Sequence, residues 1–173
     1  MGVDAWIQCP VVMLVPMTFG EKVRQFELSR RRHAGERAAA DGIDVDEAER
    51  QVDDLIERLL PQGFETPGHN FMWIVEGDDK ERVGWTWVGP ELDDSAAYYI
   101  WDIEIAEAVR GAGLGGKALD QIEILVREAG ANRLDLHVFE TNAVARRLYE
   151  SKGFVVSNKE REHIDMSKDL EGA

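Results

Sequence analysis

Arg110-Gly-Ala-Gly-Leu-Gly-Gly116 is the most informative stretch of the chain. It follows an apolar segment, 98–105, that predicts a strand, and it precedes an amphipathic segment that predicts a helix ending near Ala129. Glycines allow tight turns and let the backbone approach a ligand closely. Free N–H groups at a helix N-terminus bind phosphate oxygens, and the helix dipole adds favourable potential. The stretch therefore predicts a loop that binds a pyrophosphate-containing cofactor.

The composition predicts one folded domain over residues 1–173. Five tryptophans and 44% hydrophobic residues suffice for a core, and no repeat or linker divides the chain. The net charge of −14 argues against binding to nucleic acid or to an anionic membrane. It suits a cationic substrate or a basic partner, although an acidic surface more often serves solubility alone.

The N-terminal residues carry the signals for location. The single cysteine, Cys9, excludes an internal disulfide and is typical of a reducing compartment. Asp4 stands where an export signal would be basic, and no apolar run is long enough to span a membrane. We therefore expect a cytoplasmic protein without a membrane partner.

Hydrophobic periodicity and capping signals predict the order of elements along the chain. Strands are expected at 11–17, 71–76, 82–88, 98–105, 133–139, 154–157 and 163–167. Helices are expected at 18–40, at 44–60, from the glycine loop to 129, and at 142–153. This order predicts an α/β fold in which four helices cover the faces of a mixed sheet of about seven strands.

The glycine loop has two interpretations. Gly111, Gly113 and Gly116 match the G-x-G-x-x-G pattern of nicotinamide and flavin enzymes, and Asp135 lies about where the ribose-binding acid would be. However, residues 106–110 separate the first glycine from its strand, and Asp135 lies inside a strand instead of at its end. An NAD(P)-binding oxidoreductase is therefore the less favoured alternative.

Two motifs together resemble those of the GNAT superfamily of N-acetyltransferases. Segment 103–116 is similar to its acetyl-CoA motif, with the core Arg/Gln-x-x-Gly-x-Gly/Ala at 110–115. Segment 142–154, Asn-Ala-Val-Ala-Arg-Arg-Leu-Tyr-Glu-Ser-Lys-Gly-Phe, is similar to the second signature. Segments 65–69 and 136–139 resemble a bacterial subgroup whose acceptors are not assigned. Glu107 departs from the proline of many members, but a turn can form without proline.

The resemblance covers essentially the whole chain and implies a GNAT-like acyl-CoA N-acyltransferase fold. It implies acetyl transfer from acetyl-CoA to a primary amine, by direct attack within a ternary complex. The acceptor would be a small molecule or a peptide, and the acidic balance weakly favours a polyamine, an amino sugar or a basic peptide. The N-terminal helices and the loop 61–70 are expected to shape the acceptor site.

The resemblance also implies which residues bind acetyl-CoA. The pantetheine arm would hydrogen-bond the backbone of strand 103–105, and the loop amides would bind the pyrophosphate, with Arg110 holding the loop or adding positive potential. Three residues of the second signature, at i, i+3 and i+7, share one helix face toward the cofactor. The full set is Ile103, Glu104, Ile105, Arg110, Gly111, Ala112, Gly113, Leu114, Gly115, Gly116, Asn142, Ala145 and Tyr149, and no metal is expected.

Two residues are candidates for the general base that takes a proton from the amine. Strand alternation places Glu104 and Asp102 on one face with Ile100, and two neighbouring carboxylates favour proton uptake. A bulge near the end of the strand would shift that alternation. His137 titrates near neutral pH and lies in an apolar strand next to the expected cleft. Glu104 is the first choice, although solvated carboxylates and a core histidine are the plain alternatives.

Tyr149 is the candidate general acid for the departing CoA thiolate. A simple packing role in the core is its alternative.

The function of the whole chain also has an alternative. A non-catalytic acyl-CoA-binding regulatory module would share the loop but lack a working base and acid. The family resemblance further implies a possible homodimer.

Overall fold

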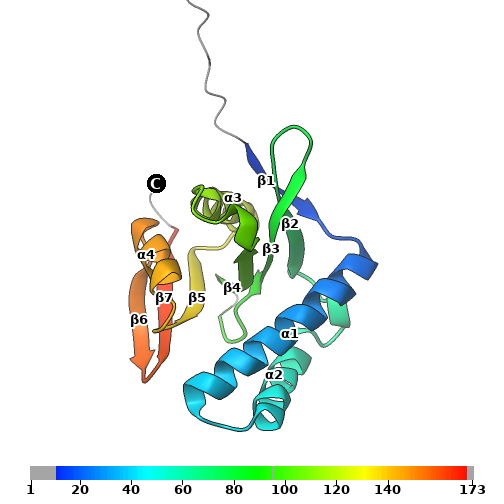
Figure 1. Ribbon diagram of the computed structural model, residues 1–173. Coiled ribbons are helices and arrows are strands. Elements are labelled where there is room, and N and C mark those ends of the chain that lie inside the picture. The colour runs from blue at the N-terminus through cyan, green and yellow to red at the C-terminus, as the bar shows by residue number, and fades with distance from the viewer. Residues whose placement is uncertain (1–10, 95, 171–173) are drawn as a thin grey trace, which may run out of the picture.

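The computed structural model describes residues 11–94 and 96–170 (Figure 1), so Cys9 and the N-terminal location signals lie outside the described residues. The strands are β1 (Val12–Pro16), β2 (Asn70–Glu76), β3 (Glu81–Pro90), β4 (Ala97–Ile105), β5 (Arg133–Phe139), β6 (Val155–Glu160) and β7 (His163–Asp169). The helices are α1 (Phe19–Asp41), α2 (Val45–Leu59), α3 (Leu114–Glu128) and α4 (Ala143–Ser151), with short 3-10 turns η1 (Gly63–Glu65) and η2 (Glu107–Val109). The predicted mixed α/β class, element order and helix number are confirmed within the described residues.

The helices begin and end where the sequence signals predict. The capping box at the start of α1 is formed, because the Thr18 backbone N–H donates to Glu21 Oε2 at 2.8 Å. Gly42 ends this helix in the left-handed conformation, with φ of 66°. Asp44 caps α2 by accepting from the Asp46 N–H at 2.9 Å. The two helices therefore meet at a short, well-defined turn.

All seven strands form one sheet in the order β1-β2-β3-β4-β5-β7-β6. Within the described residues β4 and β5 are the only parallel neighbours, and they pair from Ala97–Arg133 to Ile100–Leu136. Beyond Ile100 and Leu136 the two strands are no longer paired with each other. A dinucleotide-binding fold needs a largely parallel sheet, so this topology argues against the NAD(P) interpretation.

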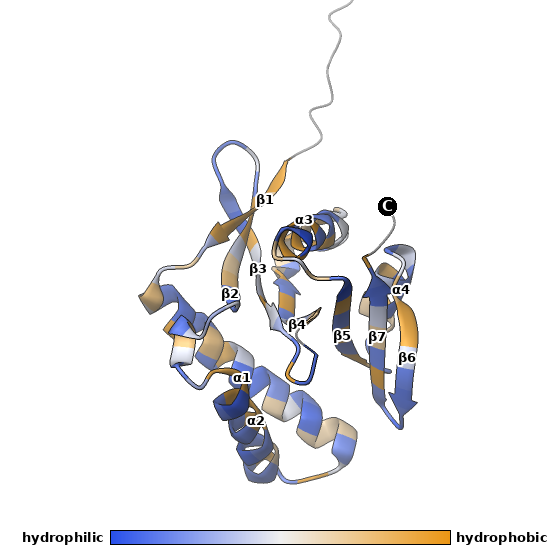
Figure 2. Ribbon diagram, turned by 180° about the vertical axis from the view of Figure 1, so that it is seen from behind, coloured by the Kyte–Doolittle hydropathy of each residue, from blue (hydrophilic) through white to orange (hydrophobic). Residues whose placement is uncertain are grey.

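The two faces of the sheet bury different helices (Figures 1 and 2). Neighbouring residues of β2 show this, because Trp73 packs with α1 and α2 while Ile74 packs with α3. Around Trp73 the cluster is aromatic, and around Ile74 it is aliphatic. No helix in the described ranges 11–94 and 96–170 is long and apolar enough to cross a membrane.

Strand β4 contains a bulge that changes which residues face α1. Trp87 pairs with Asp102 and Val88 pairs with Ile100, so Trp101 is an extra residue without a partner in β3. Ile100 packs in a hydrophobic cluster with Leu119 and Ile122 of α3, whereas Asp102 accepts a hydrogen bond from Ser29 of α1. The prediction that Ile100 and Asp102 share a face was therefore wrong, because the extra residue reverses the alternation in mid-strand.

Gly84 keeps β3 and β4 close enough to pair. A Cβ at this position would lie 2.1 Å from the Glu104 carbonyl oxygen, so Gly84→Ala must push the two backbones apart. We expect Gly84→Ala to lower the free energy of unfolding by about 2 kcal/mol in urea denaturation. The control Gly35→Ala, in α1 with nothing within 4 Å of the added Cβ, should raise it by about 0.5–1 kcal/mol. Equal effects of the two changes would contradict this account.

Candidate functional site

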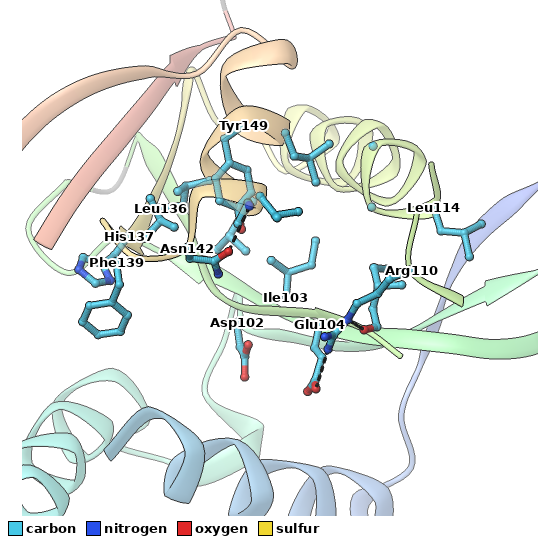
Figure 3. Close-up of a pocket in the computed structure, with 18 of the residues that line it drawn as sticks. Asp102, Ile103, Glu104, Arg110, Leu114, Leu136, His137, Phe139, Asn142 and Tyr149 are labelled. Atoms are coloured by element: carbon cyan, nitrogen blue, oxygen red, sulfur yellow. Dashed lines mark hydrogen bonds and ion pairs between the residues drawn. The ribbon is translucent and has the colours of Figure 1, made fainter. Parts of the chain in front are cut away.

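A cavity of about 780 Å³ lies where β4 and β5 separate (Figure 3). Its walls come from β4, the glycine loop, α4, the end of β5 and the middle of α1. Every site residue that the sequence predicted lines this cavity except Ala112. The fold therefore brings together residues that are up to 46 positions apart in the predicted set, from Ile103 to Tyr149.

The end of β4 offers a free edge to this cavity. Residues 103–105 pair with β3 on one side, through Thr86, Trp85 and Gly84. On the other side the pairing with β5 has already ended at Ile100. Backbone N–H and C=O groups need partners when they are covered. An extended ligand with amide groups could supply these partners as an added strand.

The glycine loop has the geometry of an anion-binding helix start. Gly111 and Gly113 have φ values of 84° and 77°, which side chains disfavour. Gly113 is the N-cap of α3. The amides of Leu114, Gly115 and Gly116 belong to the first helical turn, where an N–H has no acceptor within the helix. These N–H groups are available to phosphate oxygens.

Two of the glycines have a packing role of their own. A Cβ on Gly115 would lie 3.0 Å from Leu148, and one on Gly116 would lie 3.1 Å from Lys152, both on or next to α4. Their small size thus lets α4 approach α3 closely. Arg110 ties the loop to the strand, because its Nε donates to the Ile105 carbonyl at 2.8 Å.

The face of α4 toward the cavity carries the three predicted residues of the second motif, Asn142, Ala145 and Tyr149. Asn142 Oδ1 accepts from the Ala145 N–H at 3.2 Å, so this side chain also caps the helix. Tyr149 is 7% exposed, and its ring lies at the cavity wall. Burial, helped by the negative charge of Asp102, raises the pKa of Tyr149 to about 12. The phenol therefore keeps its proton at neutral pH.

Glu104 and Asp102 share one cation, Arg32 of α1, which the sequence analysis did not single out. The Arg32 guanidinium hydrogen-bonds Glu104 through Nη1, and its Nη2 lies 2.7 and 2.6 Å from the two Asp102 oxygens. His33 Nε2 lies 3.2 Å from Asp102 Oδ2. Burial alone would raise the pKa of Asp102, but His33, Arg32 and the Ser29 hydroxyl lower it overall. The cation thus offsets the repulsion that was expected between the two carboxylates.

His137 begins a chain of three titratable side chains. Its Nε2 lies 3.0 Å from His163 Nδ1, and His163 Nε2 lies 2.7 Å from Asp41 Oδ1. A carboxylate only accepts, so His163 Nε2 carries hydrogen, and in the tautomer that leaves a lone pair on His163 Nδ1 this atom accepts from His137 Nε2–H. This arrangement leaves the lone pair of His137 on Nδ1. Burial and the neighbouring His163 lower the pKa of His137 to about 4, so the ring is neutral at pH 7.

Three side chains near the cavity, Arg32, His33 and His163, were not predicted as site residues. Arg32 and His33 lie in the segment 18–40 that was predicted to be a helix. Their contact with Asp102 of β4 depends on how that helix crosses the sheet, which the sequence does not indicate. His163 was placed in a predicted strand without a role.

Comparisons with known proteins agree with this geometry. The model of the "Acetyltransferase (GNAT) family" matches residues 28–154. The uncharacterized N-acetyltransferase YycN of Bacillus subtilis is 34% identical over 145 residues, which are 83% of this chain and 92% of YycN. A second B. subtilis protein, the uncharacterized N-acetyltransferase YdgE, is 35% identical over 65% of this chain and 71% of its own length.

The crystal structure of YycN has the same fold. It superposes with a TM-score of 0.73 and 32% sequence identity, covering 86% of this chain and 98% of YycN. The family match decides between the two interpretations of the glycine loop, because residues 28–154 include both motifs. With the family model, two curated relatives and a solved structure in agreement, the chain belongs to the GNAT family of acetyltransferases.

Proposed function

We propose that this enzyme moves an acetyl group from acetyl-CoA to a primary amine by direct attack within a ternary complex. The observation that carries the proposal is the free edge of 103–105, which leads to the amides of Leu114–Gly116 inside one cavity of about 780 Å³. This arrangement fits an extended pantetheine arm that ends in a pyrophosphate. Bound acetyl-CoA supplies the activated thioester, and an N–H near Ile105 would donate to its carbonyl oxygen as charge develops.

We assign the general base to His137 and keep Glu104 as the alternative. Both oxygens of Glu104 already face cations, because Arg32 hydrogen-bonds one of them and Arg110 Nη2 lies 3.8 Å from the other. His137 is uncharged at pH 7 and has a lone pair that the hydrogen bond to His163 leaves free, although burial makes it a weaker base than an exposed histidine. Glu104 would instead contribute negative charge next to the incoming ammonium.

The hydrogen-bonded side chains next to His137, His163 and Asp41, provide a path by which the proton can leave the base. When Nδ1 of His137 takes a proton from the amine, its Nε2 proton passes to His163 Nδ1. The positive charge then rests on His163, beside the carboxylate of Asp41. His163 and Asp41 thus act as positioning and relay groups behind the base. Tyr149, which burial keeps protonated, is the candidate general acid and would donate a hydrogen bond from its hydroxyl to the departing CoA thiolate.

Cofactor binding is tested by parallel calorimetric titrations with acetyl-CoA, CoA and NAD(P). We expect acetyl-CoA to bind and NAD(P) not to bind. Gly113→Ala forces a side chain into φ of 77°, and this should weaken acetyl-CoA binding about tenfold because the loop amides are re-aimed. Gly130→Ala imposes a similar conformation, φ of 87°, at the far end of α3 and should leave binding unchanged. NAD(P) binding, or equal effects of both changes, would contradict the assignment of the loop.

A non-catalytic acyl-CoA-binding module remains the alternative function. It would bind acetyl-CoA but acetylate none of a library of primary amines, with release of free thiol as the readout. The homodimer stays a prediction, and its most suitable surface is the edge strand β6, where Val155 and Val156 are exposed.

A further inference from the structure

A second cavity, of about 230 Å³, adjoins the cofactor cavity between α1, α2 and the sheet. The two cavities share five lining residues, namely His33, Ile100, Trp101, His137 and Phe139. Because His137 lines both cavities, a molecule whose amine lies between His137 and the acetyl donor can place its remaining atoms in the second cavity. The following inference about the acceptor rests on the proposed acetyl transfer.

The walls of the second cavity are mainly aromatic and aliphatic. Tyr99 and Trp101 stack with ring centroids 4.2 Å apart, and Trp87 meets the ring of Phe26 at 5.3 Å in an edge-to-face arrangement. The apolar lining residues are Phe26, Val52, Leu55, Ile56, Leu59, Trp87, Tyr99, Ile100, Trp101 and Phe139. Such walls stabilise a flat apolar group through burial and through offset or edge contacts between rings.

None of the side chains that line this cavity in the described residues is a carboxylate. Its polar lining residues are Ser29, Arg30, His33, Arg37, His137 and His163, so no Asp or Glu lines it within the described part of the chain. Trp101 Nε1 and Arg37 Nε are buried without a hydrogen-bond partner among residues 11–94 and 96–170. Arg30 and Arg37 are paired with Asp53 and Asp41, which do not line the cavity, so a second ammonium group would find no unpaired carboxylate on these walls.

We infer that the acceptor is a monoamine carried on an aromatic ring, and not a polyamine. The stacked Tyr99–Trp101 pair lies on the face toward α1 and α2, and the bulge at Trp101 brings Asp102 to this same face. The ring of the acceptor lies between this pair and α2, and its short alkyl chain carries the amine to His137. The acidic balance of the whole chain, which weakly favoured a polyamine, reflects other surfaces.

The test compares phenethylamine with ethylamine, which lacks only the phenyl ring, and with spermidine. At saturating acetyl-CoA, kcat/KM for phenethylamine should exceed that for ethylamine about 30-fold, from burial of the ring. Leu55→Trp fills the cavity from α2 and should remove this preference while the rate with ethylamine persists. Leu28→Trp, on the exposed side of α1 and outside both cavities, is the matched control and should leave the preference intact.

Binding separates this inference from the proposed function. Calorimetry should show phenethylamine binding to the protein in the presence of CoA, and about tenfold weaker binding to Leu55→Trp. If phenethylamine binds in this way but no amine is acetylated, the proposed function is wrong and the aromatic site stands. A kcat/KM for spermidine equal to or above that for phenethylamine overturns the inference, as does a preference that Leu55→Trp leaves unchanged.

Discussion

Replacing His137 with glutamine is expected to lower kcat about 100-fold, with little change in KM for acetyl-CoA. Glutamine has no basic lone pair, so it cannot take the amine proton although its amide can still hydrogen-bond His163. The matched change Glu104→Gln should cost less than about tenfold, because Arg32 already holds that carboxylate. Initial rates with thiol detection measure both. The reverse order, with Glu104→Gln the more damaging change, would move the base to Glu104.

The relay behind His137 predicts a pH dependence that a packing role does not. The groups around the imidazole pair are Asp41, Arg37 and His33 of α1 and Asp165 of β7. Protonation of His137, whose pKa burial lowers to about 4, removes the lone pair that accepts the amine proton, so activity falls as the pH approaches 4. Asp41→Asn removes a negative charge, which lowers the affinity of the pair for that proton. We expect a lower plateau rate and an acid limb displaced toward lower pH.

His137 also links stability to pH. Its pKa is about 4 in the folded protein and near 6.5 in an unfolded chain, so between these values the unfolded state binds more protons. The contribution of His137 to stability is therefore complete above pH 6.5 and is lost as the pH falls toward 4. His137→Gln should flatten the dependence of the urea midpoint on pH in this window. A dependence as steep as that of the wild type would contradict the buried neutral state.

Tyr149→Phe is the second change with a large expected effect. Removing the hydroxyl leaves the thiolate without a proton donor, and we expect kcat to fall about 100-fold. The ring still fills its place against Phe154, so folding and acetyl-CoA affinity should change little. Tyr98→Phe, which removes a hydroxyl from a tyrosine lining neither cavity, is the control and should retain full activity. A KM effect without a kcat effect would assign Tyr149 to binding instead of proton donation.

The sequence predicted the local features well because each has a local cause. The capping box at Thr18 and Glu21 involves residues three apart, and Gly111 and Gly113 are needed for their own backbone angles. The part of the cavity proposed to bind the pyrophosphate could therefore be predicted, because it consists of the glycine loop and the first turn of α3. Strand 154–157 was predicted too short, because its pairing with β7 continues to Glu160.

The missed features depend on contacts between distant segments. Arg32 reaches Asp102 across 70 positions, and His163 reaches Asp41 across 122. No periodicity in either segment indicates which side chain of α1 meets which strand. The bulge at Trp101 is a property of the β3–β4 register, so strand alternation alone placed Ile100 and Asp102 on the same face.

The two cavities divide the chain into stretches that can evolve at different rates. The residues proposed to bind the acetyl donor lie between Ile103 and Tyr149, whereas α1 and α2, which precede Leu60, supply much of the wall of the second cavity, where we place the acceptor. Substitutions on those helices can therefore alter which amine is accepted without changing the glycine loop that we propose binds the donor. An ancestral enzyme of this kind could change its substrate through its first sixty residues while its reaction stayed the same.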